Sequence, residues 1–184
     1  MPAETPPSDP TGPERSPGAA DADDGAAFET LVSTFDYPMF VVTTSGGGKL
    51  AGCLVGFATQ VSIRPRRFLV GLSDKNHTYR IASLGDRLTV HVLERTETDL
   101  ARLFGERTGD DVDKFAHCGW DTGPGGVAVL SRAAGWFSGP ILERIRLGDH
   151  VAHLIAPDSG ENRRPGASLL SFDDVQDFEP GHDA

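Results

Sequence analysis

Cysteine is scarce in this chain, which has two cysteines among 184 residues, Cys53 and Cys118. They lie far apart and form no CxxC pair, so the sequence offers neither a zinc ribbon nor a dithiol redox motif. Free cysteines are usually buried, and disulfides are rare in reducing compartments. We therefore expect two free, mostly buried thiols in a reducing compartment.

Long hydrophobic runs are also absent, since no uninterrupted apolar stretch approaches the roughly 20 residues that span a bilayer. Residues 1–25 have neither the basic start nor the apolar core of a secretory signal. The patterns HExxH, GxSxG and GxGxxG do not occur, which argues against a zinc protease, a serine hydrolase and a dinucleotide-binding fold of the doubly wound type. These observations predict a cytoplasmic protein with no membrane segment and no metal site.

An excess of positive charge is lacking as well, because the formal net charge is −10. The acidity belongs to the two ends: residues 1–27 hold six acids and one base, and residues 172–184 hold five acids and no base. Residues 28–171 hold sixteen acids and sixteen bases, so the body of the chain is neutral. This pattern excludes the basic footprint of a nucleic-acid binder, and acidic ends usually serve solubility.

The composition predicts one domain between two tails. Residues 1–26 are rich in Pro, Gly, Ala, Ser and acids and show no apolar periodicity, so we expect a disordered acidic tail. The domain is expected over 27–173, beginning with a short helix from Phe28 to Phe35, and an acidic C-terminal tail over 174–184.

Strand patterns dominate the expected domain. β-branched and apolar residues predict strands at 38–44, 50–58, 67–73 and 87–93, three more between 127 and 156, and a last one at 168–172. Helices are expected at 76–85 and 96–105, the second with Thr96 as its cap. The triple glycine Gly46–Gly48 is interpreted as a hairpin turn rather than a phosphate loop, because a strand follows it. The fold class is therefore mainly β: a small antiparallel barrel, Greek-key-like, with peripheral helices.

The stretch Thr59–Arg80 combines bases with short polar side chains. Arg64, Arg66, Arg67, Lys75 and Arg80 stand against one acid, Asp74. A neighbouring apolar strand with Gly52 and Gly56 would let a flat ligand approach the backbone. The stretch suits a planar ring with an anionic tail, but a hairpin, a surface arginine cluster and a capped helix would give the same pattern.

Ordered motifs carry a family resemblance. The stretches "AGCLVGFATQVSIRPRRFLVGLSDKNHTYRIA", "RLTVHVL", "TDLARLFG", "DKF" and "GDHVAHLI" resemble, in this order over about residues 35–156, the flavin reductase-like family of FMN-binding split barrels. The resemblance implies a homodimer of split β-barrels that binds FMN, or FAD in some members. It also implies reduction of the flavin by NADH or NADPH, which often supplies a separate flavin-dependent monooxygenase.

The resemblance also implies site residues. Carried over by position, Val55, Gly56, Phe57, Thr59 and Gln60 would line the isoalloxazine and ribityl chain, and Ser62 would close the following turn. The ribityl phosphate would be held by a second group, which is Ser73, Lys75, Asn76, His77 and Thr78. His150 is the catalytic candidate, since the family places this histidine at the nicotinamide side of the flavin, where an imidazole orients the dinucleotide or moves a proton.

Two features leave alternatives open. Many members carry a polar Asn or Ser where Gly56 and Phe57 stand, so a non-catalytic flavin carrier or electron-transfer protein is the alternative function. Gly148–His150 is also explained by a turn that opens a strand.

A shared metal on His150 and His153 is excluded, because residues three apart on a strand face opposite sides. We expect His91 to point outward, and Trp136 and Phe137 to serve the core or a dimer contact.

Overall fold

The computed structural model describes residues 21–181 in two compact units, which meet in sequence between Phe35 and Asp36. The described part of the first unit is helix α1 (Asp21–Val32) with the turn after it. The helix begins before Phe28, so residues 21–26 are helical where the sequence predicted a disordered tail. The rest of that predicted tail lies outside the described residues.

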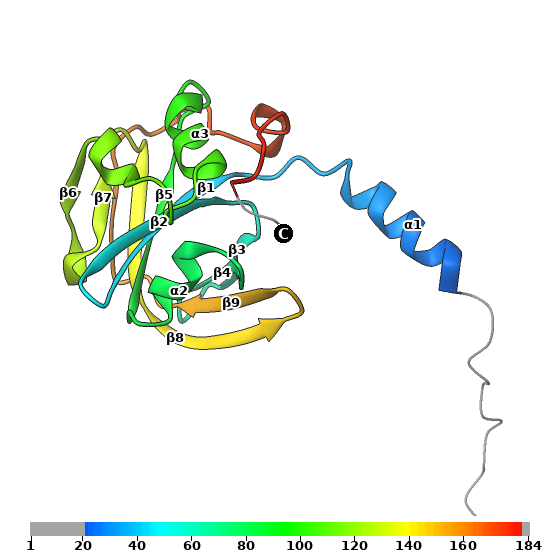
Figure 1. The fold of residues 1–184 in the computed structure, drawn as a ribbon, viewed down its shortest axis with the longest axis horizontal. Coiled ribbons are helices and arrows are strands. Elements are labelled where there is room, and N and C mark those ends of the chain that lie inside the picture. Colours follow the sequence, from blue (N-terminus) through cyan, green and yellow to red (C-terminus); the bar gives the residue numbers. More distant parts are fainter. Residues whose placement is uncertain (1–20, 182–184) are drawn as a thin grey trace, which may run out of the picture. The chain divides into compact units, whose positions relative to one another are not determined.

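The second unit is built mainly of strands, joined by short helices (Figure 1). Its strands are β1 (Phe40–Gly46), β2 (Lys49–Val55), β3 (Ala58–Ser62), β4 (Arg67–Ser73), β5 (Arg87–Val92), β6 (Trp120–Thr122), β7 (Ala128–Leu130), β8 (Gly135–Leu147), β9 (His150–Ile155) and β10 (Ser159–Asn162). Its helices are α2 (His77–Ala82), α3 (Thr98–Glu106) and the 3-10 turns η1 (Lys114–His117), η2 (Pro124–Gly126) and η3 (Phe172–Asp174). The prediction of a mainly β, antiparallel fold is confirmed.

Strand β8 joins two half-sheets. The strand order is β2-β1-β5-β8-β9-β4-β3, with every pair antiparallel and β10 paired to β8. Residues 135–140 of β8 pair with β5, whereas residues 141–147 pair with β9. The sequence predicted two strands here; the chain instead runs through as one. At the crossing, a Cβ on Gly139 would lie 2.4 Å from the Ala156 carbonyl oxygen, so this position requires glycine.

Two apolar clusters lie on opposite faces of β1. Phe40 and Val42 belong to the cluster between the half-sheets, with Val70, Leu72 and Ile155. The intervening Val41 belongs to the second cluster, which α3 covers with Leu100, Ala101 and Phe104. Because both faces of β1 are covered, its side chains are buried almost without alternation.

The turn and cap predictions had mixed outcomes. Gly46 pairs with Lys49, and Gly47 and Gly48 have φ of 56° and 76°, so the glycine-rich hairpin turn is confirmed. Helix α3 has Glu97 at its N-cap position without a side-chain cap, so the Thr96 cap is wrong. The predicted strand at 168–172 is reduced to two isolated bridges, Pro38 with Ser171 and Glu94 with Leu169.

Two expectations about single side chains met opposite outcomes. His91 is fully buried, where the alternation of its strand predicted an outward position. Its Nδ1 lies 2.9 Å from the Val41 carbonyl oxygen, and its Nε2 accepts a hydrogen bond from the Leu130 N–H at 3.1 Å. Cys53 is buried and Cys118 is half-buried, and both are free thiols as predicted.

Within residues 21–181, no helix has the length and apolar character needed to cross a bilayer.

Candidate functional site

The ends of three strands converge at one edge of the barrel. Ser73, at the end of β4, lies opposite His150, the first residue of β9, in the antiparallel register. The Gly71 N–H donates a 2.7 Å hydrogen bond to the Phe57 carbonyl oxygen, which ties the segment after β2 to the same place. Residues that are far apart in sequence therefore share one site.

Two cavities meet at this edge. The first, here called the Tyr37 cavity, measures about 440 Å³ and lies between these strand ends and the C-terminal segment that includes Phe172 and Phe178. The second, the Thr59 cavity, measures about 420 Å³ and lies on the outer face of β3, β4 and β9. Both are lined by Gly56, Phe57, Gly71 and His150, which form their common boundary.

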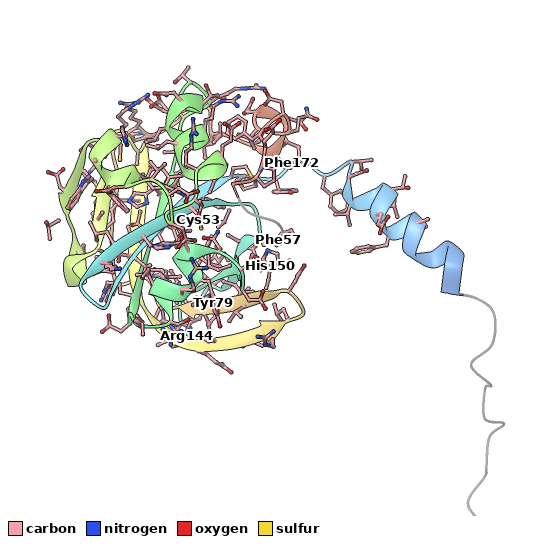
Figure 2. The ribbon with its side chains drawn as sticks, viewed as in Figure 1. Cys53, Phe57, Tyr79, Arg144, His150 and Phe172 are labelled. Carbon is pink, nitrogen blue, oxygen red and sulfur yellow. The ribbon has the colours of Figure 1, made fainter. Side chains whose placement is uncertain are left out.

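Phe57 and His150, which both line the two cavities, are neighbours in the structure (Figure 2). Their ring centroids are 5.0 Å apart in an edge-to-face arrangement. His150 Nδ1 donates to Asp149 Oδ1 at 2.8 Å, because an ionised carboxylate can only accept. This hydrogen bond lowers the pKa of Asp149, and it leaves Nε2 as the nitrogen that can reach a ligand.

Two glycines at this boundary give room to neighbouring aromatic side chains. A Cβ on Gly56 would lie 2.4 Å from a ring carbon of Tyr37, and one on Gly71 would lie 3.1 Å from Cβ of Phe57. At position 56, the space of a side chain is therefore already filled by the Tyr37 ring. Glycine at these positions therefore allows the aromatic side chains of Tyr37 and Phe57 to pack against the strands.

The residues predicted to hold a phosphate fall into three environments. Ser73 and Asn76 line the Tyr37 cavity, and Lys75 is exposed beside them. His77 points elsewhere: its Nδ1 donates to Asp110 Oδ1 at 2.8 Å, in a separate cavity of about 530 Å³. Thr78 is 1% exposed, and its amide donates to the Asn76 side chain at 2.8 Å, which caps α2.

The structure thus brings seven of the twelve predicted site residues to the two cavities: Val55, Gly56, Phe57, Thr59, Ser73, Asn76 and His150. Gln60 and Ser62 lie further along β3, where the Gln60 amide donates to the Ser62 carbonyl oxygen at 3.2 Å. Neither lines the two cavities, and the same holds for Lys75, His77 and Thr78.

Sequence analysis missed one wall of the site. Tyr37 stacks on Phe172 with ring centroids 5.0 Å apart, and both line the Tyr37 cavity with Gln176 and Phe178. Phe172, Val175 and Phe178 recur at every third position within the acidic C-terminal stretch. That apolar spacing was the available signal that this stretch packs on the domain.

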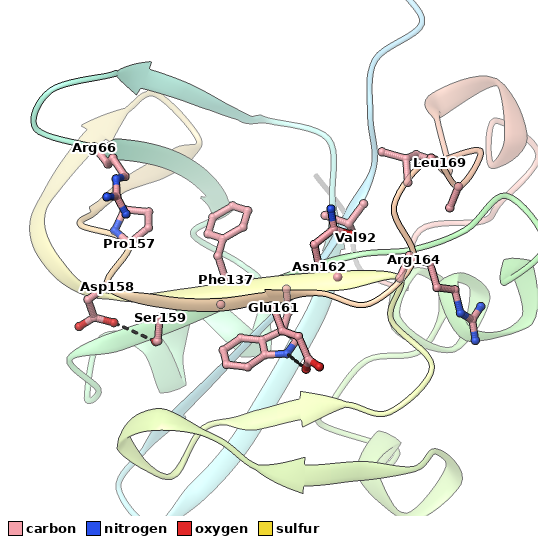
Figure 3. Close-up of a pocket in the computed structure, with 16 residues that line it drawn as sticks. Arg66, Val92, Phe137, Pro157, Asp158, Ser159, Glu161, Asn162, Arg164 and Leu169 are labelled. Atoms are coloured by element: carbon pink, nitrogen blue, oxygen red, sulfur yellow. Dashed lines mark hydrogen bonds between the residues drawn. The ribbon is translucent and has the colours of Figure 1, made fainter.

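Another cavity, shown in Figure 3, has none of the predicted site residues in its lining. It measures about 780 Å³ and is lined by Arg66, Phe137 and residues of β10, among others. Phe137 packs edge-to-face on Phe68 with centroids 4.9 Å apart, which fits its predicted role in packing. Among residues 21–181, no three His, Cys, Asp or Glu side chains come together as metal ligands.

Comparisons with known proteins identify the family of this chain. The model of the flavin reductase like domain matches residues 32–175. The chain is 30% identical over 127 residues to the FMN reductase (NADH) RutF of Methylorubrum extorquens, covering 69% of this chain and 62% of the relative's length. It is 28% identical over 147 residues to the 4-hydroxyphenylacetate 3-monooxygenase reductase component of Salmonella typhimurium, covering 79% and 86% of the two chains.

A solved structure shows the same fold. The NADH:FAD oxidoreductase SgcE6 of Streptomyces globisporus superposes with a TM-score of 0.73 at 22% identity, covering 91% of this chain and 96% of the other. The family model covers most of the sequence, including Gly56, Gly71 and His150. The chain therefore belongs to the flavin reductase like domain family.

Proposed function

We propose that this chain binds FMN at the strand-end site and reduces it with NADH or NADPH. The observation that carries the proposal is the position of His150, whose Nδ1 is held by Asp149 and whose ring lies at the boundary of two cavities. Relatives named as NADH-dependent FMN reductase and as the reductase component of a monooxygenase support it. FAD is the alternative flavin, since a structural neighbour is named an NADH:FAD oxidoreductase.

Different residues of the site would contact the ring end and the phosphate end of the flavin. Bound flavin would accept the hydride of the dinucleotide, and that chemistry belongs to the cofactors. Gly56 and Gly71 line both cavities, and Thr59 lines the Thr59 cavity. Ser73, Asn76 and Lys75 would hold the phosphate end. His77 could join them only if its bond to Asp110 opened, and Gln60, Ser62 and Thr78 would act by shaping β3 and α2.

His150 would orient the dinucleotide through Nε2. The Asp149 carboxylate fixes the tautomer that carries the proton on Nδ1, so Nε2 is presented as an acceptor. Phe57 restricts the ring of His150 from one side. Both side chains thereby position a planar ring without forming a covalent bond to it.

One observation favours a second candidate, the non-catalytic flavin carrier or electron-transfer protein. Phe57 is 62% exposed and packs its ring against His150, where many family members have a small polar residue. This aromatic ring narrows the approach to the imidazole. A carrier would bind flavin at the same site and would not oxidise a dinucleotide.

The test is a titration followed by reduction. We expect the fluorescence of FMN to be quenched when it binds to the protein. Addition of NADH or NADPH under anaerobic conditions should then bleach the flavin absorbance promptly. His150→Ala should slow the bleaching about 100-fold while leaving FMN affinity within about threefold, since the imidazole acts on the dinucleotide. His117→Ala, at an exposed side chain at the end of η1, is the control.

Each alternative outcome has a meaning. Binding without bleaching by either dinucleotide would establish the carrier. Failure to bind FMN and FAD would contradict the proposed site altogether.

A homodimer is part of the proposal. The antiparallel register places Ile145, Ala152 and Gly71 on one face of β8, β9 and β4, with Leu147 and His150 beside them. Ile145 and Leu147 are 39% and 54% exposed on this outer face, which also carries the Thr59 cavity. Ala152 on this face is fully buried, so Ile145 and Leu147 supply the exposed apolar surface. Exposed apolar side chains beside a cavity are typical of a protein interface, and a second copy would cover them and close the cavity.

This dimer makes its own prediction. Ile145→Asp would place a charge in the interface, so we expect it to convert the dimer to a monomer in sedimentation velocity. Leu84→Asp, at an exposed apolar side chain after α2, should leave the dimer intact. A monomeric wild-type chain, or a dimer that tolerates Ile145→Asp, would contradict the assigned face. A monooxygenase as recipient of reduced flavin, and a cytoplasmic location, remain predictions.

A further inference from the structure

The stretch from Phe172 to Gly181 is fastened to the domain at several points. Val175 is 5% exposed in the cluster beneath α3. The Arg102 guanidinium lies 4.2 Å from the centroid of the Phe178 ring, and the Gly181 N–H donates to the Gly105 carbonyl oxygen at 3.1 Å. The sequence predicted an acidic C-terminal tail over 174–184, and Val175, Phe178 and Gly181 of this stretch contact the domain.

This stretch forms one whole side of the Tyr37 cavity. Phe172, Val175, Gln176, Phe178 and Pro180 line it from the C-terminal side. Phe57, Ser73, Asn76 and His150 line it from the strand side. The family match ends at residue 175, so Gln176, Phe178 and Pro180 lie beyond the part of the chain that defines the family.

The aromatic side chain of Tyr37 belongs to this wall because position 56 is a glycine. Tyr37 occupies the volume that a side chain at position 56 would need, and it is held there by its stack on Phe172. The wall is therefore mainly aromatic and apolar, and its polar groups are the Tyr37 hydroxyl and the amide of Gln176. That amide is exposed, and its Nε2 donates to the Asp173 carbonyl oxygen at 3.3 Å, which orients the side chain.

We propose that Gln176 and Phe178 bind the ring of the ligand in the Tyr37 cavity. The ligand class is a planar heteroaromatic ring with an amide or imide edge, which the flavin ring and the nicotinamide carboxamide share. Phe178 contributes apolar contact, and the Gln176 amide, which both donates and accepts, pairs with the polar edge. The proposal rests on the proposed function and adds to it the residues that select the ring.

The first experiment compares Gln176→Ala with Glu179→Gln, a change at an exposed residue of the same stretch that does not line the cavity. We expect Gln176→Ala to weaken binding of FMN and riboflavin equally, by about tenfold, because the lost hydrogen bond is to the ring and not to the phosphate. Phe178→Leu should act in the same direction. Glu179→Gln should bind both flavins as the wild type does.

A second arm separates the two sources of the ring. If the amide pairs with nicotinamide, flavin affinity stays unchanged and the NADH concentration for half-maximal bleaching rises about tenfold. Wild-type values in both arms for Gln176→Ala and Phe178→Leu would overturn the proposal. Failure of the proposed function gives a different result, since the wild-type chain itself would then bind no flavin.

Because Gln176 is exposed, its replacement should leave the melting temperature at the wild-type value, so lost binding reports the contact and not the fold.

Discussion

Lys114→Met is expected to lower the free energy of unfolding by about 3 kcal/mol, because it removes a buried cation that ties two elements together. Lys114 is 5% exposed, and its Nζ donates to the carbonyl oxygens of Gly52 at 3.0 Å and Phe104 at 3.1 Å. The Phe104 carbonyl belongs to the last turn of α3, where carbonyl groups have no partner within the helix. Lys114 therefore closes the end of α3 and fastens it to β2.

The size of this effect comes from two opposing contributions. Burial lowers the pKa of Lys114, so removal of its charge relieves some cost of desolvation. Methionine has a similar length but no donor, and it leaves two carbonyl groups unpaired in a buried place. We expect the second contribution to dominate.

The matched control is Lys49→Met, the same replacement at an exposed position of β2. Its effect should stay within about 0.5 kcal/mol. Denaturation with urea measures both variants, and equal midpoints for the two would show that the buried hydrogen bonds contribute nothing.

Acid should begin to destabilise this protein above the range in which carboxylates titrate. Burial lowers the pKa of His91 to about 4. The neutral ring donates from Nδ1 to the Val41 carbonyl oxygen and accepts at Nε2 from Leu130, so a second proton would break the latter bond. The unfolded chain takes up this proton below about pH 6.5, and the folded chain resists it until about pH 4.

The sign follows from linkage. Above pH 6.5 His91 is neutral in both states, so it adds no pH dependence. Between pH 6.5 and pH 4 the unfolded state binds more protons, and the free energy of unfolding falls by about 3 kcal/mol in total. Burial also lowers the pKa of His153, which adds to the loss in the same direction.

A series of denaturation curves from pH 8 to pH 4 tests this expectation. His91→Gln should remove the proton uptake of one group from the pH dependence of the free energy of unfolding. A wild-type stability that stays constant down to pH 4 would contradict the buried neutral imidazole. The ion pairs Arg80–Asp110 and Arg87–Asp158 affect stability at lower pH. Their carboxyl groups have pKa values of about 2, so their contribution to the free energy of unfolding is lost only below pH 4.

Local patterns were sufficient where a residue's neighbours in sequence decide its structure. The triple glycine between two apolar strands specified the hairpin of β1 and β2, since only glycine readily takes the positive φ that the turn needs. Alternating apolar residues specified most strands, and the ordered motifs around Gly56, Ser73 and His150 indicated the family and the main strands of its site.

Other features depended on partners that are distant in sequence. His91 was expected outside because period-two alternation shows which face of a strand is apolar, not whether the opposite face is also covered. Here β7 covers it and supplies the Leu130 amide. Likewise β8 is one strand because β5 pairs with its first half and β9 with its second, which no local signal around Pro140 reveals.

The sequence by itself determined the mainly β class, the turn chemistry and the family, because these follow from residue type and short spacing. Only the tertiary structure decided that Tyr37 fills the space beside Gly56 and that the acidic C-terminal stretch forms a wall of the Tyr37 cavity. The physical reason is that such a wall is made by packing between segments that are distant in sequence. The acidic composition of this stretch does not indicate that Phe172, Val175 and Phe178 pack on the domain and hold the stretch in place.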